Sequence, residues 1–177
     1  MLADSDGLSD VGRSFVAGQL RYMRELTLFL APNINSYKRY VEGSFAPTAL
    51  RWGRDNRTCA FRLVGHGASL RMENRIPGGD VNPYLATAAV VAAGLPGIEE
   101  HLELEPAFEG NAYDDPAAEH VPTSLAEAAD LWRGSEFARR TFGDDVVDHY
   151  ANMAAVELAA FGRAVTDWER FRGFERL

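Results

Sequence analysis

The sequence has a single cysteine, Cys59, and this scarcity excludes two kinds of architecture. A disulfide framework and a zinc site built from thiolates both need more than one cysteine. Histidine is also scarce, and the four that occur show neither HxH nor HExxH spacing: His66, His101, His120 and His149. The sequence therefore predicts no histidine-built metal site.

Long hydrophobic runs are missing as well. No segment approaches the roughly 20 apolar residues that a membrane helix needs. No signal peptide is visible at the start, so the cytoplasm is the expected location. Basic residues are outnumbered, with 18 Lys and Arg against 26 Asp and Glu and a net charge of −8. This balance argues against a general role in binding nucleic acid or membrane surfaces.

What the chain does contain is the composition of a globular domain. It has 177 residues, of which 46% are hydrophobic and 25% charged. That length supports one sizeable core, and that hydrophobic content is too high for a disordered chain.

Helical patterns occupy both ends of the chain. Residues 9–30 are predicted to form a helix that Ser9 or Asp10 caps and Pro32 ends. Asn82 and Pro83 open a second helix, which Gly94 should stop. Between 99 and 121 the chain is rich in acid, Pro and Gly and should be irregular. Ser124 and Glu127 then form a capping-box pattern ahead of a short helix that runs through Trp132. A last, long helix is predicted from about Asp145 to Trp168.

Residues 47–75 have the texture of strands. The segments PTALRW, TCAFRLV and LRMENR are separated by the turn-like GRDN and GHGAS, so the simplest prediction is a three-stranded meander. In LRMENR, alternation places Arg71, Glu73 and Arg75 on one face and Leu70 and Met72 on the other. Three strands with so charged a face make a poor sheet, so we expect the sheet to need strands outside this sequence.

Four more basic residues precede this strand: Lys38, Arg39, Arg57 and Arg62. Arginine offers a planar fork of donors that fits carboxylate and phosphate oxygens, and Glu73 is an oxygen ligand of the kind that Mg²⁺ prefers. The residues alone leave two interpretations open. The charged face is either a solvated, ion-paired surface or the lining of an active site.

A set of motifs extends this interpretation. The chain carries NSYKR, a glycine-containing flap ending in AP, NRT, R-x-E-x-R-x-P and NPYLA…AAGL-GI, in an order that resembles the C-terminal part of the glutamine synthetase catalytic domain. The likeness covers roughly residues 7–113, and VTDWE extends it toward the C-terminus. It implies an α+β fold: part of a mainly antiparallel curved sheet backed by helices, with a helical C-terminal region.

The resemblance also implies a chemistry. Family members use ATP to phosphorylate glutamate, and ammonia or an amine then displaces phosphate to give a γ-glutamyl amide. By position, the residues that would hold glutamate and the migrating phosphoryl group are Arg39, Arg57 and Arg75, with Arg57 and Arg75 in catalytic roles. Arg62 and Arg71 would bind ATP, and Glu73 would bind Mg²⁺ or Mn²⁺. The family forms stacked rings, which implies a homo-oligomer.

The flap departs from the pattern of the ammonia-using members. They carry a glutamate one residue before AP, where this chain has Phe45 in VEGSFAP. Phenylalanine cannot accept a proton, but it can wall an apolar or extended amine, including by cation–π contact. The chain is therefore more similar to the γ-glutamylpolyamine and related γ-glutamylamine synthetase branch. Glu42 is an alternative carboxylate at a different place in the flap, and authentic glutamine synthetase remains the alternative function.

The extent of the likeness carries a further expectation. Residues 1–177 match the C-terminal portion of a catalytic domain, so the N-terminal domain and the first half of the catalytic domain, with its other metal ligands, should lie outside this sequence. We expect the chain to be inactive alone, and a non-catalytic fragment or oligomer-building module is the rival hypothesis. Tyr113, in NAYDD, lies where some bacterial members carry an adenylylated tyrosine, although an ordinary loop tyrosine is the simpler interpretation.

Overall fold

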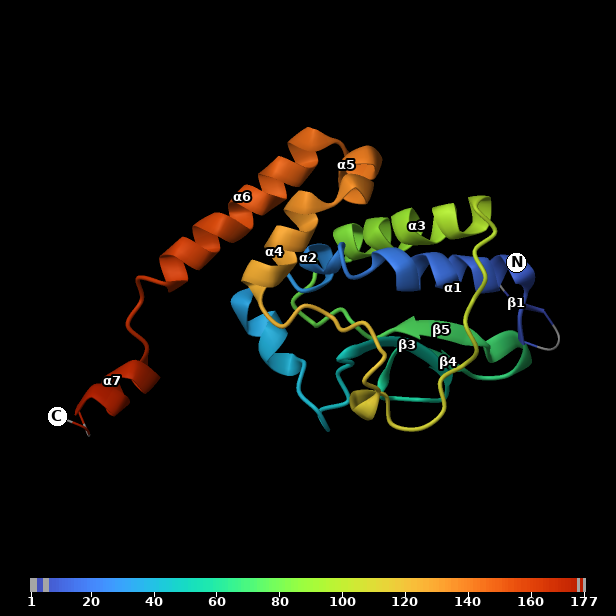
Figure 1. The fold of residues 1–177 in the computed structure, drawn as a ribbon, viewed down its shortest axis with the longest axis horizontal. Coiled ribbons are helices and arrows are strands. Elements are labelled where there is room, and N and C mark those ends of the chain that lie inside the picture. Colours follow the sequence, from blue (N-terminus) through green and yellow to red (C-terminus); the bar gives the residue numbers. More distant parts are fainter. Residues whose placement is uncertain (1–2, 5–6, 175, 177) are drawn as a thin grey trace.

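The computed structural model describes residues 3–4, 7–174 and 176. Two long helices, α1 (Asp10–Tyr22) and α3 (Pro83–Glu99), lie side by side across one face of a small sheet (Figure 1). The sheet consists of β3 (Ala49–Arg54), β4 (Cys59–Val64) and β5 (Arg71–Asn74). A sheet of this size backed by helices confirms the α+β class that the sequence predicts.

The remaining elements surround this two-layer body. At the N-terminus, β1 (Ala3–Asp4) pairs antiparallel with β2 (Gly7–Leu8). Short helices follow and intervene between the strands and loops: α2 (Thr27–Leu30) and the 3₁₀ helices η1 (Ile34–Arg39), η2 (Gly67–Ser69) and η3 (Ala112–Asp114). The C-terminal region is helical, with α4 (Leu125–Gly134), α5 (Glu136–Phe142), α6 (Asp144–Phe161) and α7 (Asp167–Phe174).

The sheet is mixed, so the predicted meander is wrong. β4 and β5 pair antiparallel, but β3 and β4 pair parallel, with Trp52 beside Phe61. The segment between them does not close a hairpin, because its polar side chains bond elsewhere. Asn56 donates its side-chain amide to the Gly110 carbonyl at 2.9 Å, and Thr58 accepts from the Ala112 amide at 2.9 Å. The chain therefore returns along the sheet before β4 begins.

The predicted helix over 9–30 is broken into two. α1 ends at Tyr22, and α2, only four residues long, is buried throughout. The turn between them lets Met23, Leu26 and the whole of α2 enter the core, where Phe29 contacts the Trp132 ring at a centroid distance of 4.4 Å. A periodic apolar pattern cannot reveal such a bend, because both halves keep apolar residues at helical spacing.

Gly94 does not end α3, which continues to Glu99. Its missing side chain serves packing instead: a Cβ at Gly94 would come within 2.0 Å of the Phe15 ring. Nearby, a Cβ at Gly18 would lie 2.3 Å from the Ala93 carbonyl oxygen and 2.9 Å from the Gly97 Cα. The glycines thus allow α1 and α3 to approach closely. The N-terminal prediction is confirmed, since Asn82 accepts a hydrogen bond from the Tyr84 amide at 3.0 Å.

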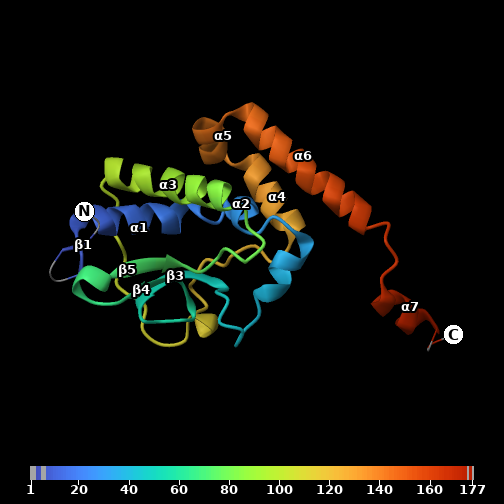
Figure 2. The same cartoon turned by 180° about the vertical axis from the view of Figure 1, so that it is seen from behind.

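The C-terminal region also differs from its prediction. The helix expected from Asp145 to Trp168 is two helices, α6 and α7, and Thr166 caps the second by accepting from the Glu169 amide. α6 packs against α4 and α5, whereas α7 has no buried residue and lies at the end of a projecting arm (Figure 2). The predicted cap of α4 is confirmed, because Ser124 accepts from the Glu127 amide at 3.2 Å.

Among the residues that the structure describes, no helix combines the length and the apolar character needed to span a bilayer.

Candidate active site

The alternating charges of β5 share one side of the strand, as predicted. Glu73 lies 3.1 Å from Arg71 and 3.7 Å from Arg75, while Leu70 and Met72 pack against the hydrophobic core. Glu73 is also the cross-strand partner of Arg62 on β4, and their ion pair measures 3.2 Å. One carboxylate is therefore shared by three guanidinium groups.

These contacts perturb the titration of the carboxylate. Burial alone would raise the pKa of Glu73, but the hydrogen bond and charge of Arg62, together with those of Arg71, outweigh it and lower the pKa below the ordinary value of 4.5. Arg62 has a second partner in Asp55, whose pKa is also lowered, chiefly by the hydrogen bond from Arg62. The side chain of Arg62 is only 12% exposed, whereas that of Arg71 is 60% exposed. The site thus holds groups of both signs that are ionised at neutral pH.

The flap, defined as residues 41–46, meets this charged face at Arg75. The Arg75 guanidinium donates to the Phe45 carbonyl at 2.6 Å. Phe45 has a left-handed backbone with a φ of +59°, and its side chain projects into solvent at 55% exposure. Left-handed geometry is costly for a phenylalanine and persists only where neighbouring contacts fix it. The structure therefore joins the flap to the arginine strand through one side chain.

Arg39 reaches the same region from η1. Its guanidinium donates to the main-chain carbonyl groups of Arg75, at 3.4 Å, and Ile76. The buried Nε atoms of Arg39 and Arg75 have no hydrogen-bond partner among the described residues, and the same is true of Nδ2 of Asn74. Buried donors without acceptors are costly. These three donors belong to residues in or next to the charged face of β5.

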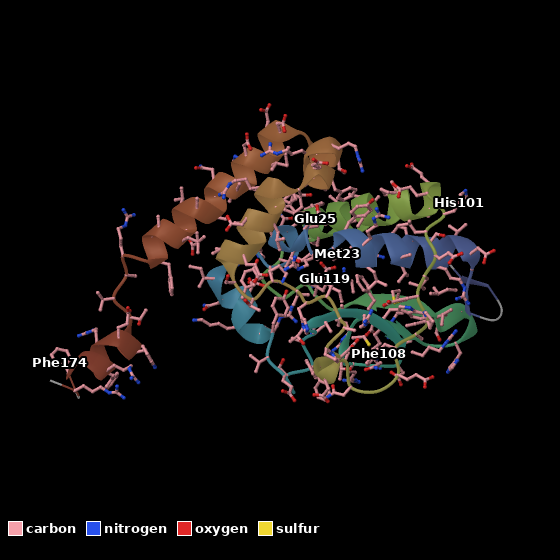
Figure 3. The ribbon with its side chains drawn as sticks, in the orientation of Figure 1. Met23, Glu25, His101, Phe108, Glu119 and Phe174 are labelled. Carbon is pink, nitrogen blue, oxygen red and sulfur yellow. The ribbon has the colours of Figure 1, made fainter. Side chains whose placement is uncertain are left out.

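The three residues of the NRT motif divide their roles. Asn56 and Thr58 bond the loop at 108–112, as described above, and Thr58 also donates to Asn56 at 2.7 Å. Arg57 is exposed and makes no ion pair with any described residue. It lines a cleft of about 550 Å³ together with Phe45 and Phe108. Figure 3 labels Phe108. Asn56 and Thr58 thus fix the loop at 108–112, while Arg57 faces the cleft.

The structure therefore brings six of the seven predicted site residues into one connected set: Arg39, Phe45, Arg62, Arg71, Glu73 and Arg75. Arg57 lies outside this set, but it shares a cleft with Phe45 and Asp55, and its charge contributes to the lowered pKa of Asp55. No sequence pattern indicated Asp55 as the second partner of Arg62, because a turn has no periodicity that pairs its residues with a strand. Tyr113, at η3, is the position at which the family resemblance implies a modified tyrosine. In the structure its hydroxyl donates to the Ala46 carbonyl at 2.8 Å.

A divalent cation does not fit these residues as they stand. In the described ranges, no group of three or more His, Cys, Asp and Glu side chains could hold a metal ion. Glu73 offers one carboxylate, and three arginines already occupy it. A metal at Glu73 would need further oxygen ligands from outside these residues and a rearrangement of the guanidinium groups.

The sequence of this chain is similar to a known protein family and to several characterised proteins. A family described as the glutamine synthetase catalytic domain matches residues 1–172. The chain is 64% identical over 176 residues to gamma-glutamylethanolamide synthetase GlnA4 of Streptomyces coelicolor, covering 99% of this chain and 38% of that protein. It is 44% identical to a glutamate–isopropylamine ligase of a Pseudomonas species, covering 93% of this chain and 37% of that one. The chain thus spans less than two fifths of the length of these relatives.

The similarity extends to solved structures. The complex of GmaS with ADP superposes with a TM-score of 0.85 at 31% sequence identity, covering 98% of this chain and 42% of GmaS. GmaS without ligand gives a TM-score of 0.83. Because the family match covers nearly the whole sequence and the fold agrees, the chain belongs to the glutamine synthetase family, in the part of the fold that forms the catalytic domain.

Proposed function

We propose that the chain is the C-terminal portion of the catalytic domain of an ATP-dependent ligase that joins the γ-carboxyl group of glutamate to an amine through γ-glutamyl phosphate. One observation carries this proposal. Arg75 contacts Glu73 on one side and the Phe45 carbonyl of the flap on the other, at 3.7 and 2.6 Å. A substrate carboxylate beside Arg75 would therefore lie between the charged strand and the residue that faces the acceptor.

The arginines fit the anionic groups of such a reaction. Arg39 and Arg75 carry buried donors without acceptors, and Arg57 faces an open cleft, which supports a role for the three in holding glutamate and the phosphoryl group that it receives. Fixed positive charge of this kind stabilises negative charge that develops during phosphoryl transfer. Arg62 and Arg71 are candidates for the ATP phosphates, with the exposed Arg71 the more accessible.

Metal and nucleotide enter the proposal in a limited way. When bound, Mg²⁺ or Mn²⁺ would neutralise phosphate charge and orient the nucleotide. Glu73 is one proposed ligand for it, and the remaining ligands would come from residues outside this sequence. Those missing ligands are the reason to expect no catalysis by the 177-residue chain alone.

Phe45 supports an amine rather than ammonia as the acceptor. Its exposed ring can pack against the carbon chain of an amine, and it offers no carboxylate to attract ammonium or remove a proton. The named activities of two relatives, on ethanolamine and isopropylamine, agree with this preference. The ammonia reaction is the second candidate, because type-1 glutamine synthetase 2 of Dictyostelium discoideum is also 44% identical.

A non-catalytic, oligomer-building role has its own supporting observation. The arm formed by α7 carries Trp168, Phe171 and Phe174 with 66%, 69% and 80% of their surface exposed. Figure 3 shows Phe174 at the tip of the arm, far from the body of the chain. Large exposed apolar side chains on a projecting segment are typical of a surface that another subunit covers. We propose that the protein forms a homo-oligomer through this arm. Such an oligomer contact could exist with or without catalysis by the same chain.

A chimera tests the catalytic proposal. Residues 1–177 would replace the matching segment of the Streptomyces coelicolor synthetase, and the product would be assayed with glutamate and Mg·ATP against ethanolamine, isopropylamine and ammonium. We expect amide formation with an amine and little with ammonium. Phe45→Glu in the chimera should raise the ammonium rate relative to the amine rate, while Phe45→Leu, which stays apolar, should not.

Three results would contradict parts of the proposal. A folded chimera that makes no amide with any acceptor would refute the ligase activity of this segment. A chimera that prefers ammonium despite Phe45 would establish the glutamine synthetase alternative. Amide synthesis by the separate 177-residue chain would show that the metal ligands inferred to be missing are not required.

A further inference from the structure

The flap is held by very few contacts from the rest of the molecule. Apart from two contacts described below, the hydrogen bonds of the flap to described residues all lie within residues 39–46. The Ser44 hydroxyl donates to the carbonyl groups of Arg39 and Val41, and the Ala46 amide donates to Ser44. The amides of Val41 and Ser44 donate to the same two carbonyl groups. Val41 to Phe45 are all exposed. Only Ala46, at the end of the flap, is buried. An exposed loop whose hydrogen bonds are mostly internal can move as a unit unless contacts from other segments fix it.

Two side chains supply that outside support, and they hold consecutive carbonyl groups. Arg75 donates to Phe45 at 2.6 Å from the end of β5, and Tyr113 donates to Ala46 at 2.8 Å from η3. The Phe45 carbonyl belongs to the peptide that follows the left-handed Phe45, and the Ala46 carbonyl belongs to the next peptide. Fixing them defines the direction in which the Phe45 ring leaves the backbone.

Tyr113 is itself anchored by a chain of hydrogen bonds. The Asn111 side chain accepts from the Tyr113 amide at 3.3 Å, and the adjacent Ala112 amide donates to Thr58 at 2.9 Å. The loop at 108–113 is thus tied to the segment that follows β3. Any displacement of this loop would pull on the flap through the Tyr113 hydroxyl.

We infer that Tyr113 is a positioning residue, which fixes the flap and thereby the orientation of the Phe45 ring at the acceptor side of the site. The contact between flap and loop is a property of this chain. Only its consequence for the choice of acceptor rests on the proposed function. Arg75 already belongs to the charged site, so Tyr113 is the contact that can be removed without touching the arginines.

Hydrogen exchange on the purified chain tests the contact without catalysis. Tyr113→Phe removes the donor and keeps the ring, and Tyr84→Phe is the matched control because Tyr84 is 85% exposed with a hydroxyl that bonds no described residue. We expect exchange of the Ser44 and Ala46 amides to become about fivefold faster in Tyr113→Phe, the effect of losing one ordinary hydrogen bond. The control should exchange as the unaltered chain does.

A second variant tests the route by which the loop acts. Thr58→Val removes the hydroxyl that accepts from the Ala112 amide, although Thr58 makes no hydrogen bond to the described residues of the flap. It should also accelerate exchange at Ser44 and Ala46. Unchanged flap exchange in Tyr113→Phe, or equal acceleration across the whole chain, would overturn the inference.

The functional consequence has a separate readout in the chimera. There, Tyr113→Phe should raise KM for the amine several-fold and change kcat less, because the acceptor pocket becomes less ordered while the arginines stay in place. An inactive parent chimera would refute the proposed function and leave the exchange result standing. An active chimera whose amine KM does not respond to Tyr113→Phe would refute the positioning role at the acceptor.

Discussion

Arg62 on β4 and Glu73 on β5 face one another across an antiparallel strand pair, with 3.2 Å between their charged groups. The same Glu73 contacts Arg71 and Arg75, so removing its charge would leave three guanidinium groups near one another. Glu73 is the one partner that the three arginines share, although Arg62 also pairs with Asp55 and Arg75 also donates to the Phe45 carbonyl. Its contribution can be measured directly.

Glu73→Gln should destabilise the chain by about 1–2 kcal/mol, since a charge-assisted hydrogen bond is lost and like charges remain, partly screened by water. The free energy of unfolding in urea at neutral pH measures this change. Glu157→Gln is the control, because Glu157 is exposed on α6 and forms no ion pair with a described residue. An equal loss in both variants would mean that the arginine contacts of Glu73 contribute nothing specific.

The pH dependence of the same difference follows from the lowered pKa of Glu73. A carboxyl group whose pKa is lower in the folded state stabilises that state fully above its unfolded pKa, and the contribution disappears as pH falls through the folded pKa. The stability gap between the unaltered chain and Glu73→Gln should therefore be constant near neutral pH and close below about pH 4.5. Urea titrations from pH 7 to pH 3 would measure it. A gap that widens on acidification would contradict this assignment.

Local patterns predicted the elements that depend on neighbouring residues. The caps at Asn82 and Ser124 were readable because a cap bonds an amide only two or three positions ahead. The common face of Arg71, Glu73 and Arg75 followed from strand alternation alone. These predictions needed no knowledge of what packs against the segment.

Contacts between segments that are far apart in the chain could not be predicted from local sequence patterns. The parallel pairing of β3 with β4 depends on bonds from Asn56 and Thr58 to a loop some 50 residues away. The break between α1 and α2 depends on the core that receives Phe29. Arg39, Phe45 and Arg57 were linked to the site by family resemblance, because no spacing rule connects a helix end, a flap and a turn.

The close approach of α1 and α3 predicts a sharp response to one methyl group. Gly18→Ala should cost about 1–3 kcal/mol, because the new Cβ would meet main-chain atoms of α3 and the two helices would have to separate. Gly134→Ala is the matched control in α4, where the new Cβ would meet no described atom within 4 Å beyond its chain neighbours and the backbone of its own helix. That variant should be neutral or stabilising by less than about 1 kcal/mol, given the poor helix propensity of glycine. Thermal and urea unfolding of both would show whether main-chain contact is the cause, and equal behaviour would exclude it.

The projecting arm makes a prediction about association. Replacing Trp168, Phe171 and Phe174 together with serine should reduce self-association in sedimentation experiments, because these side chains would be covered only by another copy of the chain. The free energy of unfolding of the monomer should change by no more than about 0.5 kcal/mol, since none of the three is buried within the chain. Tyr84→Ser, an exposed aromatic residue on α3, is the control and should leave association unchanged. If the triple variant instead unfolds at a lower urea concentration as a monomer, the arm folds back on its own chain, and another surface must be sought for the oligomer contact.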